Sequence, residues 1–203
     1  MKPRLATLVE TMYHFKTSQA HASISYNAGR AQELLRNLNF IYPEPRTGRD
    51  LYRHPIIQRA IDTTWFRNKD DVGVVNHEQF SPMPISIIAI TLTVIECCID
   101  EWSDGTQRDC NWDDAKIQTV YDSHFSSLVD FQVQRPTSLY QLQCDLSRNA
   151  REHAGVPPDP VTGSSRLPPG ALDAVREEPS PGPSPTAPPN YDDTFPRITV
   201  GRV

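Results

Sequence analysis

The sequence predicts an all-α protein, an irregular bundle of about five or six helices followed by a disordered proline-rich C-terminal tail. Two observations predict it. Apolar residues recur at three-to-four spacing along residues 1–155, and 12 of the 19 prolines fall in residues 156–203. A segment so rich in proline buries too little apolar surface to offset the entropy of ordering. We therefore expect a helical domain at 1–155 and a tail at 156–203.

The first two helices are expected at 4–16 and 27–39, where apolar residues fall on one helical face. The small and polar residues at 17–26 predict a connection between these helices. Turn-forming residues at 43–48 then end the second helix.

A third helix is expected to begin at Pro55. Proline suits a first helical position, because its missing N–H would have no partner there. An apolar stripe extends this helix to Phe66, and the polar residues 67–80 predict a loop.

The segment 84–102 is the most apolar part of the chain. On a helix, its mostly polar positions form one narrow stripe, made of Ser86, Ala89, Thr93, Glu96 and Asp100. This pattern is typical of a central helix that its neighbours surround almost completely. β-branched residues also alternate at 87–95, as in a strand, but the length of the segment favours a helix that stops at Gly105.

The clearest helical pattern covers 111–132, with Asn111 as the expected N-cap. Its apolar face consists of Ile117, Val120, Tyr121, His124, Phe125, Leu128 and Phe131. A weaker last helix starts at Pro136 and becomes polar before Gly155. Four aromatic residues are expected in or at the edge of one core, namely Trp65, Trp102, Tyr121 and Phe125.

Several features favour an intracellular protein of the cytoplasm or nucleus. Glu10 interrupts the apolar N-terminal stretch before it becomes a signal-peptide core, and no Asn-x-Ser/Thr sequon occurs. No apolar run reaches the roughly 18 residues of a membrane helix. Four cysteines in 203 residues exclude a disulfide scaffold.

Charge is segregated along the chain, with a net charge of +6 in residues 1–69 and −9 in residues 70–155. The basic N-terminal half leaves a nucleic-acid-associated protein as one alternative. Against it, no helix shows a Lys/Arg stripe with interleaved aromatics that could follow a phosphate backbone. A simpler explanation is that the two oppositely charged halves lie against each other, so that their charges compensate.

The spacing of ligand-type residues argues against a metal site. An EF-hand loop that starts at Asp100 would need ligands where Trp102 and Asn111 stand. Cys97 and Cys98 are adjacent and point to different helix faces, and Cys110 and Cys144 are solitary, so we expect structural buried thiols. The glycine-containing motifs of serine hydrolases, phosphate loops and dinucleotide sites are also missing. We therefore assign no metal, cofactor or catalytic residue.

The tail carries one candidate docking motif. Pro188, Pro189, Asn190 and Tyr191 form the Pro-Pro-x-Tyr pattern that WW domains bind, with the prolines in an aromatic groove and the tyrosine in a second pocket. Two serines followed by proline, Ser180 and Ser184, are candidate phosphorylation sites for proline-directed kinases.

Ordered anchors along the chain resemble a known family. They are Tyr-Arg-His-Pro-Ile-Ile at 52–57, Trp-Phe at 65–66, Pro-Ile-Ser-Ile-Ile-Ala at 84–89, Cys-Cys-Ile-Asp-Glu-Trp-Ser-Asp-Gly at 97–105 and Tyr-Asp-Ser-His-Phe at 121–125. Over roughly residues 30–135 the chain resembles the domain-of-unknown-function family numbered 6532, which is abundant in mushroom-forming fungi. Members usually carry more helical sequence upstream than the stretch before Ala31, which implies a truncated copy or a shortened gene model. The family has no established activity, so the resemblance implies a helical domain and transfers no catalytic residue.

Three functions remain open. The first is a non-enzymatic helical interaction module with a recruiting tail. The second is an enzyme or small-ligand-binding domain with a pocket beside 84–102, where Glu96 is expected to be partly buried and either paired with an arginine or on the polar stripe. The third is the nucleic-acid-associated protein described above. The sequence does not decide whether the protein is an enzyme, but it favours a protein without enzymatic activity.

Overall fold

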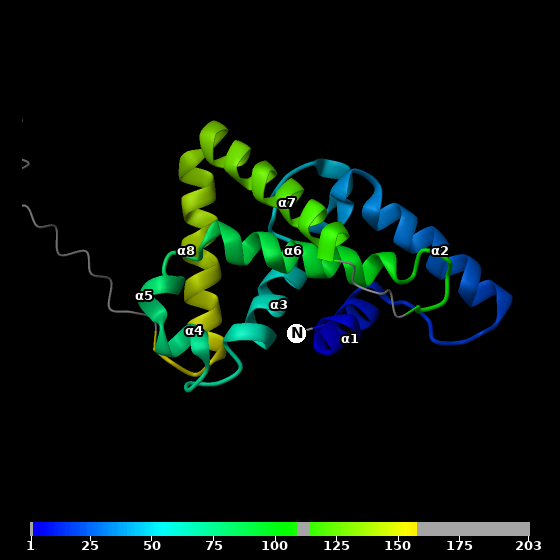
Figure 1. The fold of residues 1–203 in the computed structure, drawn as a ribbon, viewed down its shortest axis with the longest axis horizontal. Helices are drawn as coiled ribbons and strands as arrows, with labels where there is room; N and C mark the ends of the chain where they lie inside the picture. The colour runs from blue at the N-terminus through cyan, green and yellow to red at the C-terminus, as the bar shows by residue number, and fades with distance from the viewer. Residues whose placement is uncertain (1, 109–113, 158–203) are drawn as a thin grey trace, which may run out of the picture. The chain divides into compact units, whose positions relative to one another are not determined.

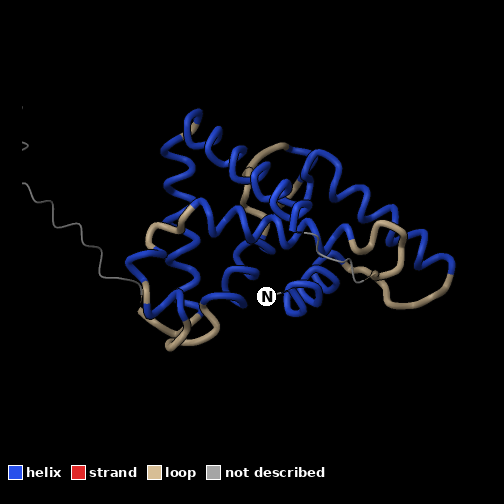
Figure 2. The backbone as a smooth tube through the Cα atoms, in the orientation of Figure 1, coloured by secondary structure: helices blue, strands red, loops and turns tan. Residues whose placement is uncertain are grey.

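The computed structural model describes residues 2–108 and 114–157. Every regular element within these two ranges is helical, and no strand occurs there, which confirms the all-α prediction (Figure 2). The elements are α1 (Lys2–Tyr13), α2 (His21–Leu35), η1 (Arg36–Ile41), η2 (Pro45–Thr47), α3 (Pro55–Trp65), α4 (Val72–Val75), α5 (His77–Phe80), α6 (Ile85–Asp100), α7 (Asp114–Gln134) and α8 (Pro136–His153), where η denotes a short 3-10 helix.

Helix α6 lies at the centre, as predicted, and packs against α1, α2, α3 and α7 (Figure 1). The strand alternative for 87–95 is therefore wrong. The predicted polar stripe is only partly correct, because Ala89 and Thr93 are fully buried. The Thr93 hydroxyl donates to the Ala89 carbonyl at 2.9 Å, so the helix itself satisfies this buried hydroxyl.

Helix α2 differs from its predicted limits at both ends. It begins at His21, six residues before the expected start, so the polar stretch 17–26 is a connection only in its first part. Buried packing of Ser23 and Asn27 on the inner face overrides the weak helix preference of this stretch. At the other end, Asn37 and Leu38 adopt positive φ values of 51° and 55°, which end the regular helix before residue 39.

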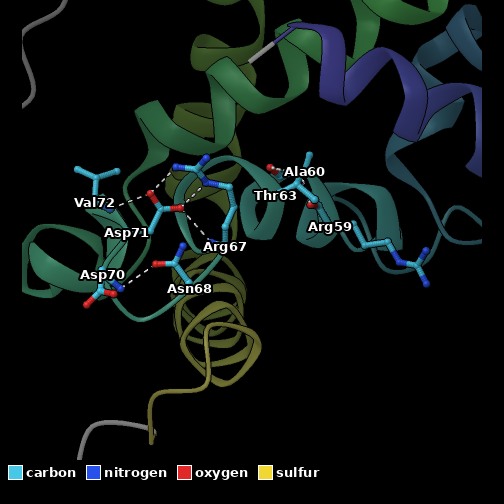
Figure 3. A network of polar contacts seen from close by, with 8 residues as sticks. All are labelled: Arg59, Ala60, Thr63, Arg67, Asn68, Asp70, Asp71 and Val72. Carbon is cyan, nitrogen blue, oxygen red and sulfur yellow. Dashed lines mark hydrogen bonds and ion pairs between the residues drawn. The ribbon is translucent and has the colours of Figure 1, made fainter.

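Helix α3 begins at Pro55 as predicted, but the expected loop 67–80 contains the short helices α4 and α5. Asp71 organises this segment (Figure 3). Its carboxylate accepts from Arg67 Nε at 2.7 Å, from Arg67 Nη2 at 2.9 Å and from the Val72 N–H that begins α4 at 3.2 Å. The hydrogen bonds from Arg67 hold the pKa of Asp71 well below its usual range. An N-cap and an ion pair thus replace the expected loop with helical turns.

Three of the four predicted core aromatics lie in or against the core, and the fourth does not. Trp102 is buried and stacks on Phe15 with ring centroids 4.8 Å apart, while Trp65 and Tyr121 are half-buried against the core. Phe125 is 37% exposed, so its predicted core position is wrong. The inner face of α7 carries the buried His124 and Leu128, with Tyr121 and Phe131 packed partly buried beside them. Phe125 follows His124 by about 100° around the helix and so lies away from this face.

Helix α1 ends at Tyr13, three residues before its predicted end at residue 16, because His14 adopts a positive φ of 60°. The limits of α7 and α8 lie closer to the sequence patterns. Helix α7 begins by Asp114, whereas its expected cap, Asn111, lies outside the described residues. Helix α8 begins at Pro136 and ends two residues before Gly155, which has a positive φ of 74°. Among the helices of residues 2–108 and 114–157, none has the length and apolar character that crossing a bilayer requires.

Candidate functional site

A cleft of about 230 Å³ lies where α1 ends, beside the second half of α2 and the η1–η2 segment. Its lining includes Tyr13, Arg30, Glu33, Tyr42, Arg46 and His54. The left-handed residues at the end of α2 turn the chain back over this helix, and the His54 N–H donates to the Ile41 carbonyl at 3.2 Å. Because ionisable side chains converge here, the cleft is the first candidate for a functional site.

Tyr13 lies at the inner wall of the cleft and is 1% exposed. Its hydroxyl donates to the Phe40 carbonyl at 3.1 Å. Burial raises the pKa of the Tyr13 hydroxyl far above its usual value. The phenol therefore stays protonated and uses its proton to hold η1 in place.

His54 lies against Tyr13, with ring centroids 5.3 Å apart. Its Nδ1 accepts the Ile56 N–H at 3.1 Å and so caps α3. Burial, and then the charge of Arg30, lower the pKa of His54 to about 4, so the ring is neutral at pH 7. A neutral ring that accepts through Nδ1 carries its proton on Nε2. His54 can thus donate one hydrogen bond, but its Nδ1 is not free to act as a base.

Arginine side chains supply the positive charge of the cleft. Arg30 Nη1 lies 2.8 Å from Glu33 Oε2, and Arg46 lines the opposite η2 segment. With a neutral His54 and a protonated Tyr13, the described lining offers hydrogen-bond donors, arginines and the carboxylates of Glu33 and Glu44, and no serine, threonine or cysteine nucleophile. The arrangement suits the binding of a small polar ligand better than catalysis by such a nucleophile.

The predicted partial burial of Glu96 is confirmed, but its partner is a histidine rather than an arginine. Glu96 Oε2 lies 2.7 Å from His124 Nε2, and the His124 side chain is 2% exposed. The His124 ring meets Phe40 edge-on at 6.1 Å, and its buried Nδ1 has no hydrogen-bond partner within the described ranges. Neither Glu96 nor His124 lines the cleft. Because 28 residues separate the two, no local spacing could have indicated the pair.

Among the described cysteines, Cys98 is buried as expected, whereas Cys97 and Cys144 are only half-buried, so the expectation of buried thiols is wrong for these two. Burial raises the pKa of Cys97 to about 11 and that of Cys98 to about 12, so both stay thiols at neutral pH. In residues 2–108 and 114–157, no group of three or more His, Cys, Asp or Glu side chains is placed to hold a metal ion.

The predicted tail residues all lie outside the described residues. These are the docking residues Pro188, Pro189 and Tyr191 and the candidate phosphorylation sites Ser180 and Ser184. Their roles therefore stay predictions from the sequence.

Comparison with known proteins identifies the domain. No curated protein and no solved structure shows significant similarity to the chain. A family model described as "Domain of unknown function (DUF6532)" matches residues 1–131, which extends the resemblance seen at 30–135 back through α1 and α2. This match covers more than half of the sequence, from α1 into α7. The chain therefore belongs to the DUF6532 family.

Proposed function

We propose that the protein is a non-enzymatic interaction module, in which a helical domain carries a tail that recruits a WW-domain protein. The observation that carries this proposal is the sequence Pro188-Pro189-Asn190-Tyr191 within a proline-rich segment. The proline pair favours a polyproline conformation before binding, so little entropy is lost when it enters an aromatic groove. Tyr191 would fill the second pocket of the WW domain.

Three of the reactive side chains of the described domain already have structural partners, which favours a non-enzymatic role. His54 caps α3 and Tyr13 holds the η1 backbone. His124 is enclosed between Glu96 and Phe40. Each group would have to give up a stabilising contact before it could act on a substrate.

Titration of a panel of isolated WW domains into the full-length chain tests the proposal. We expect at least one domain to bind with a micromolar dissociation constant, on the order of −8 kcal/mol. Tyr191→Ala should weaken this binding at least about tenfold, since a hot-spot tyrosine fills its own pocket. Tyr140→Ala is the matched control, because Tyr140 is a 60% exposed tyrosine of α8 outside the motif.

Two outcomes would refute the docking proposal. Either no WW domain binds the chain, or the Tyr191→Ala chain binds as tightly as the wild type. If binding is found, phosphorylation of Ser184 should alter its affinity, because a phosphate adds about −1.5 to −2 charges close to the motif.

The cleft favours a second candidate function, the binding of a small polar ligand. Arg30 is close enough to influence both Tyr13 and His54 electrostatically, so charge and hydrogen-bond donors converge there. A screen of small acids, amides and alcohols by two-dimensional NMR tests this function. Fragments that shift the His54 ring signals in the wild type, and not in Arg30→Gln, would support it. A screen without such fragments would refute it.

A further inference from the structure

The outer side of α7 carries four apolar residues at a spacing of four, which we call the α7 row: Tyr121, Phe125, Val129 and Val133. Successive members are displaced by about 40° around the helix, so the row winds away from the buried His124 and ends on the opposite side of the helix. Phe125 is 37% exposed and Val133 is 77% exposed, while Tyr121 and Val129 are half-buried. In Figure 1 the end of α7 that joins α8 lies at the upper margin of the helical domain. The row therefore leaves apolar surface in contact with water.

Two aromatic side chains of the α7 row restrict each other. The rings of Tyr121 and Phe125 stack, with centroids 5.9 Å apart and an interplanar angle of 25°. Tyr121 also packs against the core, so the stack limits the movement of the more exposed Phe125 ring. An aromatic side chain that is already ordered loses little entropy when a partner covers it, and aromatic residues supply much of the binding energy of many interfaces. The pair is thus suited to lie at the centre of a contact surface.

The charged residues that α7 places beside the row are acidic. Asp122 and Asp130 are exposed and lie within about 60° of the end of the row around the helix. Lys116 is the only lysine or arginine of α7, and its ammonium pairs with Asp100 of α6 at 2.8 Å. The next basic residue, Arg135, lies beyond the end of α7. Negative charge therefore borders the row, which favours a partner that carries lysines or arginines around an apolar surface.

The spacing of the α7 row indicates the shape of the partner. Side chains at i and i+4 form a ridge that packs between the corresponding ridges of a second helix. The row extends about 18 Å along α7, because a helix rises about 1.5 Å per residue, so about three turns of a partner helix would cover it. A second copy of this chain fits less well, because it would bring two acidic borders together and like charges across an interface disfavour binding.

We propose that the α7 row docks a basic amphipathic helix of another protein, whose apolar face covers Phe125 and whose lysines or arginines lie near Asp122 and Asp130. The interaction rests on the described domain and is independent of the docking motif in the tail. One helix face offers much less than the roughly 800 Å² per partner of a standard interface. We therefore expect transient binding, with a dissociation constant on the order of 10–100 μM.

The test uses a fluorescent model peptide of about four helical turns, with leucines on one face and lysines on the other. The full-length chain is titrated into this peptide, and fluorescence anisotropy reports binding. Amide signals of the 15N-labelled chain then locate the contact. We expect saturable binding and shifts of the α7 amides around Phe125. A peptide in which glutamate replaces every lysine should bind at least about tenfold more weakly, because its charges would oppose Asp122 and Asp130.

Three variants separate the apolar contribution from the electrostatic one. Phe125→Ala should weaken binding of the leucine–lysine peptide at least about tenfold, since it removes the ring at the centre of the row. Tyr26→Ala is the matched control, because Tyr26 is a 39% exposed aromatic residue of α2, and this variant should bind as the wild type does. Asp122→Asn keeps an oxygen that can accept from Gln118 Nε2, at 2.8 Å in the wild type, but removes the charge. It should weaken binding about twofold, as expected for an exposed ion pair.

The proposal is overturned if the leucine–lysine peptide shows no saturable binding, or if it binds Phe125→Ala as tightly as the wild type. Equal binding of the leucine–glutamate peptide, or an affinity that Asp122→Asn leaves unchanged, would overturn the basic character of the partner. Sedimentation velocity tests the other occupant of the row. If the wild type is a dimer that Phe125→Ala dissociates, a second copy of the chain covers the row and the proposal is wrong.

Discussion

Replacement of Asn27 by alanine should destabilise the protein more than any other single polar substitution described above. The side chain is fully buried and forms three hydrogen bonds to the backbone of two loops. Alanine cannot form any of them, so the Lys16 N–H and the carbonyls of Lys16 and Gly105 would lose their partner. The bond to the Gly105 carbonyl is buried and the two to Lys16 are partly buried, so the groups left without a partner lose part of their desolvation compensation.

The magnitude follows from the number of bonds. A hydrogen bond contributes a net free energy of about 0.5–1.5 kcal/mol, so the loss of three amounts to about 3 kcal/mol. For a domain of this size, about 1 kcal/mol corresponds to roughly 2–4 °C in Tm, which gives a decrease of about 6–12 °C. Asn27→Asp should not restore stability, because a carboxylate would place an acceptor against the two carbonyls.

The decrease in Tm is measured by thermal unfolding followed by circular dichroism at 222 nm, the wavelength of the helix signal. Asn39→Ala is the matched control, because Asn39 donates one hydrogen bond, to the Glu33 carbonyl at 2.9 Å. We expect it to cost about 1 kcal/mol or less. If Asn27→Ala and Asn39→Ala lower Tm by the same amount, the three hydrogen bonds of Asn27 do not stabilise the protein as their number implies.

Three further predictions concern packing and pH. Leu92→Ala, at a fully buried position of α6, should lower the free energy of unfolding in urea by about 2–5 kcal/mol, whereas Phe125→Ala should lower it by less than about 1 kcal/mol; equal effects would contradict the orientation of α7. The pKa of Asp71 is lowered by its hydrogen bonds to Arg67, so the stability that this ion pair supplies is present above about pH 4 and is lost as the pH falls below it. Asp71→Asn should therefore differ from the wild type at pH 7, and the difference should shrink by pH 3 in the same urea assay; a difference that does not change with pH would contradict this. The pKa of His54 is about 4, below its unfolded value of about 6.5, so stability should decline as the pH falls through this interval. His54→Asn, which keeps an N-cap acceptor, should remove that decline, and a variant with the full wild-type decline would assign it to another group.

Local patterns predicted the elements whose position depends on one amphipathic face. The apolar length of 84–102 was sufficient to place α6 at the centre, and Pro55 was sufficient to place the start of α3. The start of α2 was not predictable in this way. Its first turns hold few apolar residues, and the burial of Asn27 depends on loops that lie up to 78 residues away. Long-range hydrogen bonds of this kind leave no periodic signal in the sequence.

The candidate sites were less predictable than the fold. Glu96 was recognisable as an ionisable group in an apolar helix, but its partner, His124, could not be chosen from several possible residues. The cleft, and the cavity between residues 16–19 and 102–107, are made largely of segments whose sequence predicts turns and connections. Their side chains gain a common position only when Tyr13, Phe15 and Trp102 pack, which requires the whole domain.

The shallow burial of α7 has a consequence for native-state motion. Two of its 21 residues are buried, whereas nine residues of α6 are buried. Nearer its ends α7 is held by the ion pair of Lys116 with Asp100, at 2.8 Å, and by the partly buried Phe131. Local opening needs only the contacts of the segment that opens, so the end turns of α7 can separate and exchange their amide protons with solvent while α6 stays folded. We expect the amides of α6, the helix with the most buried residues, to exchange more slowly than those of α7. An opening that lifts the middle of α7 would separate His124 from Glu96, and the carboxylate would then face water within an otherwise native domain.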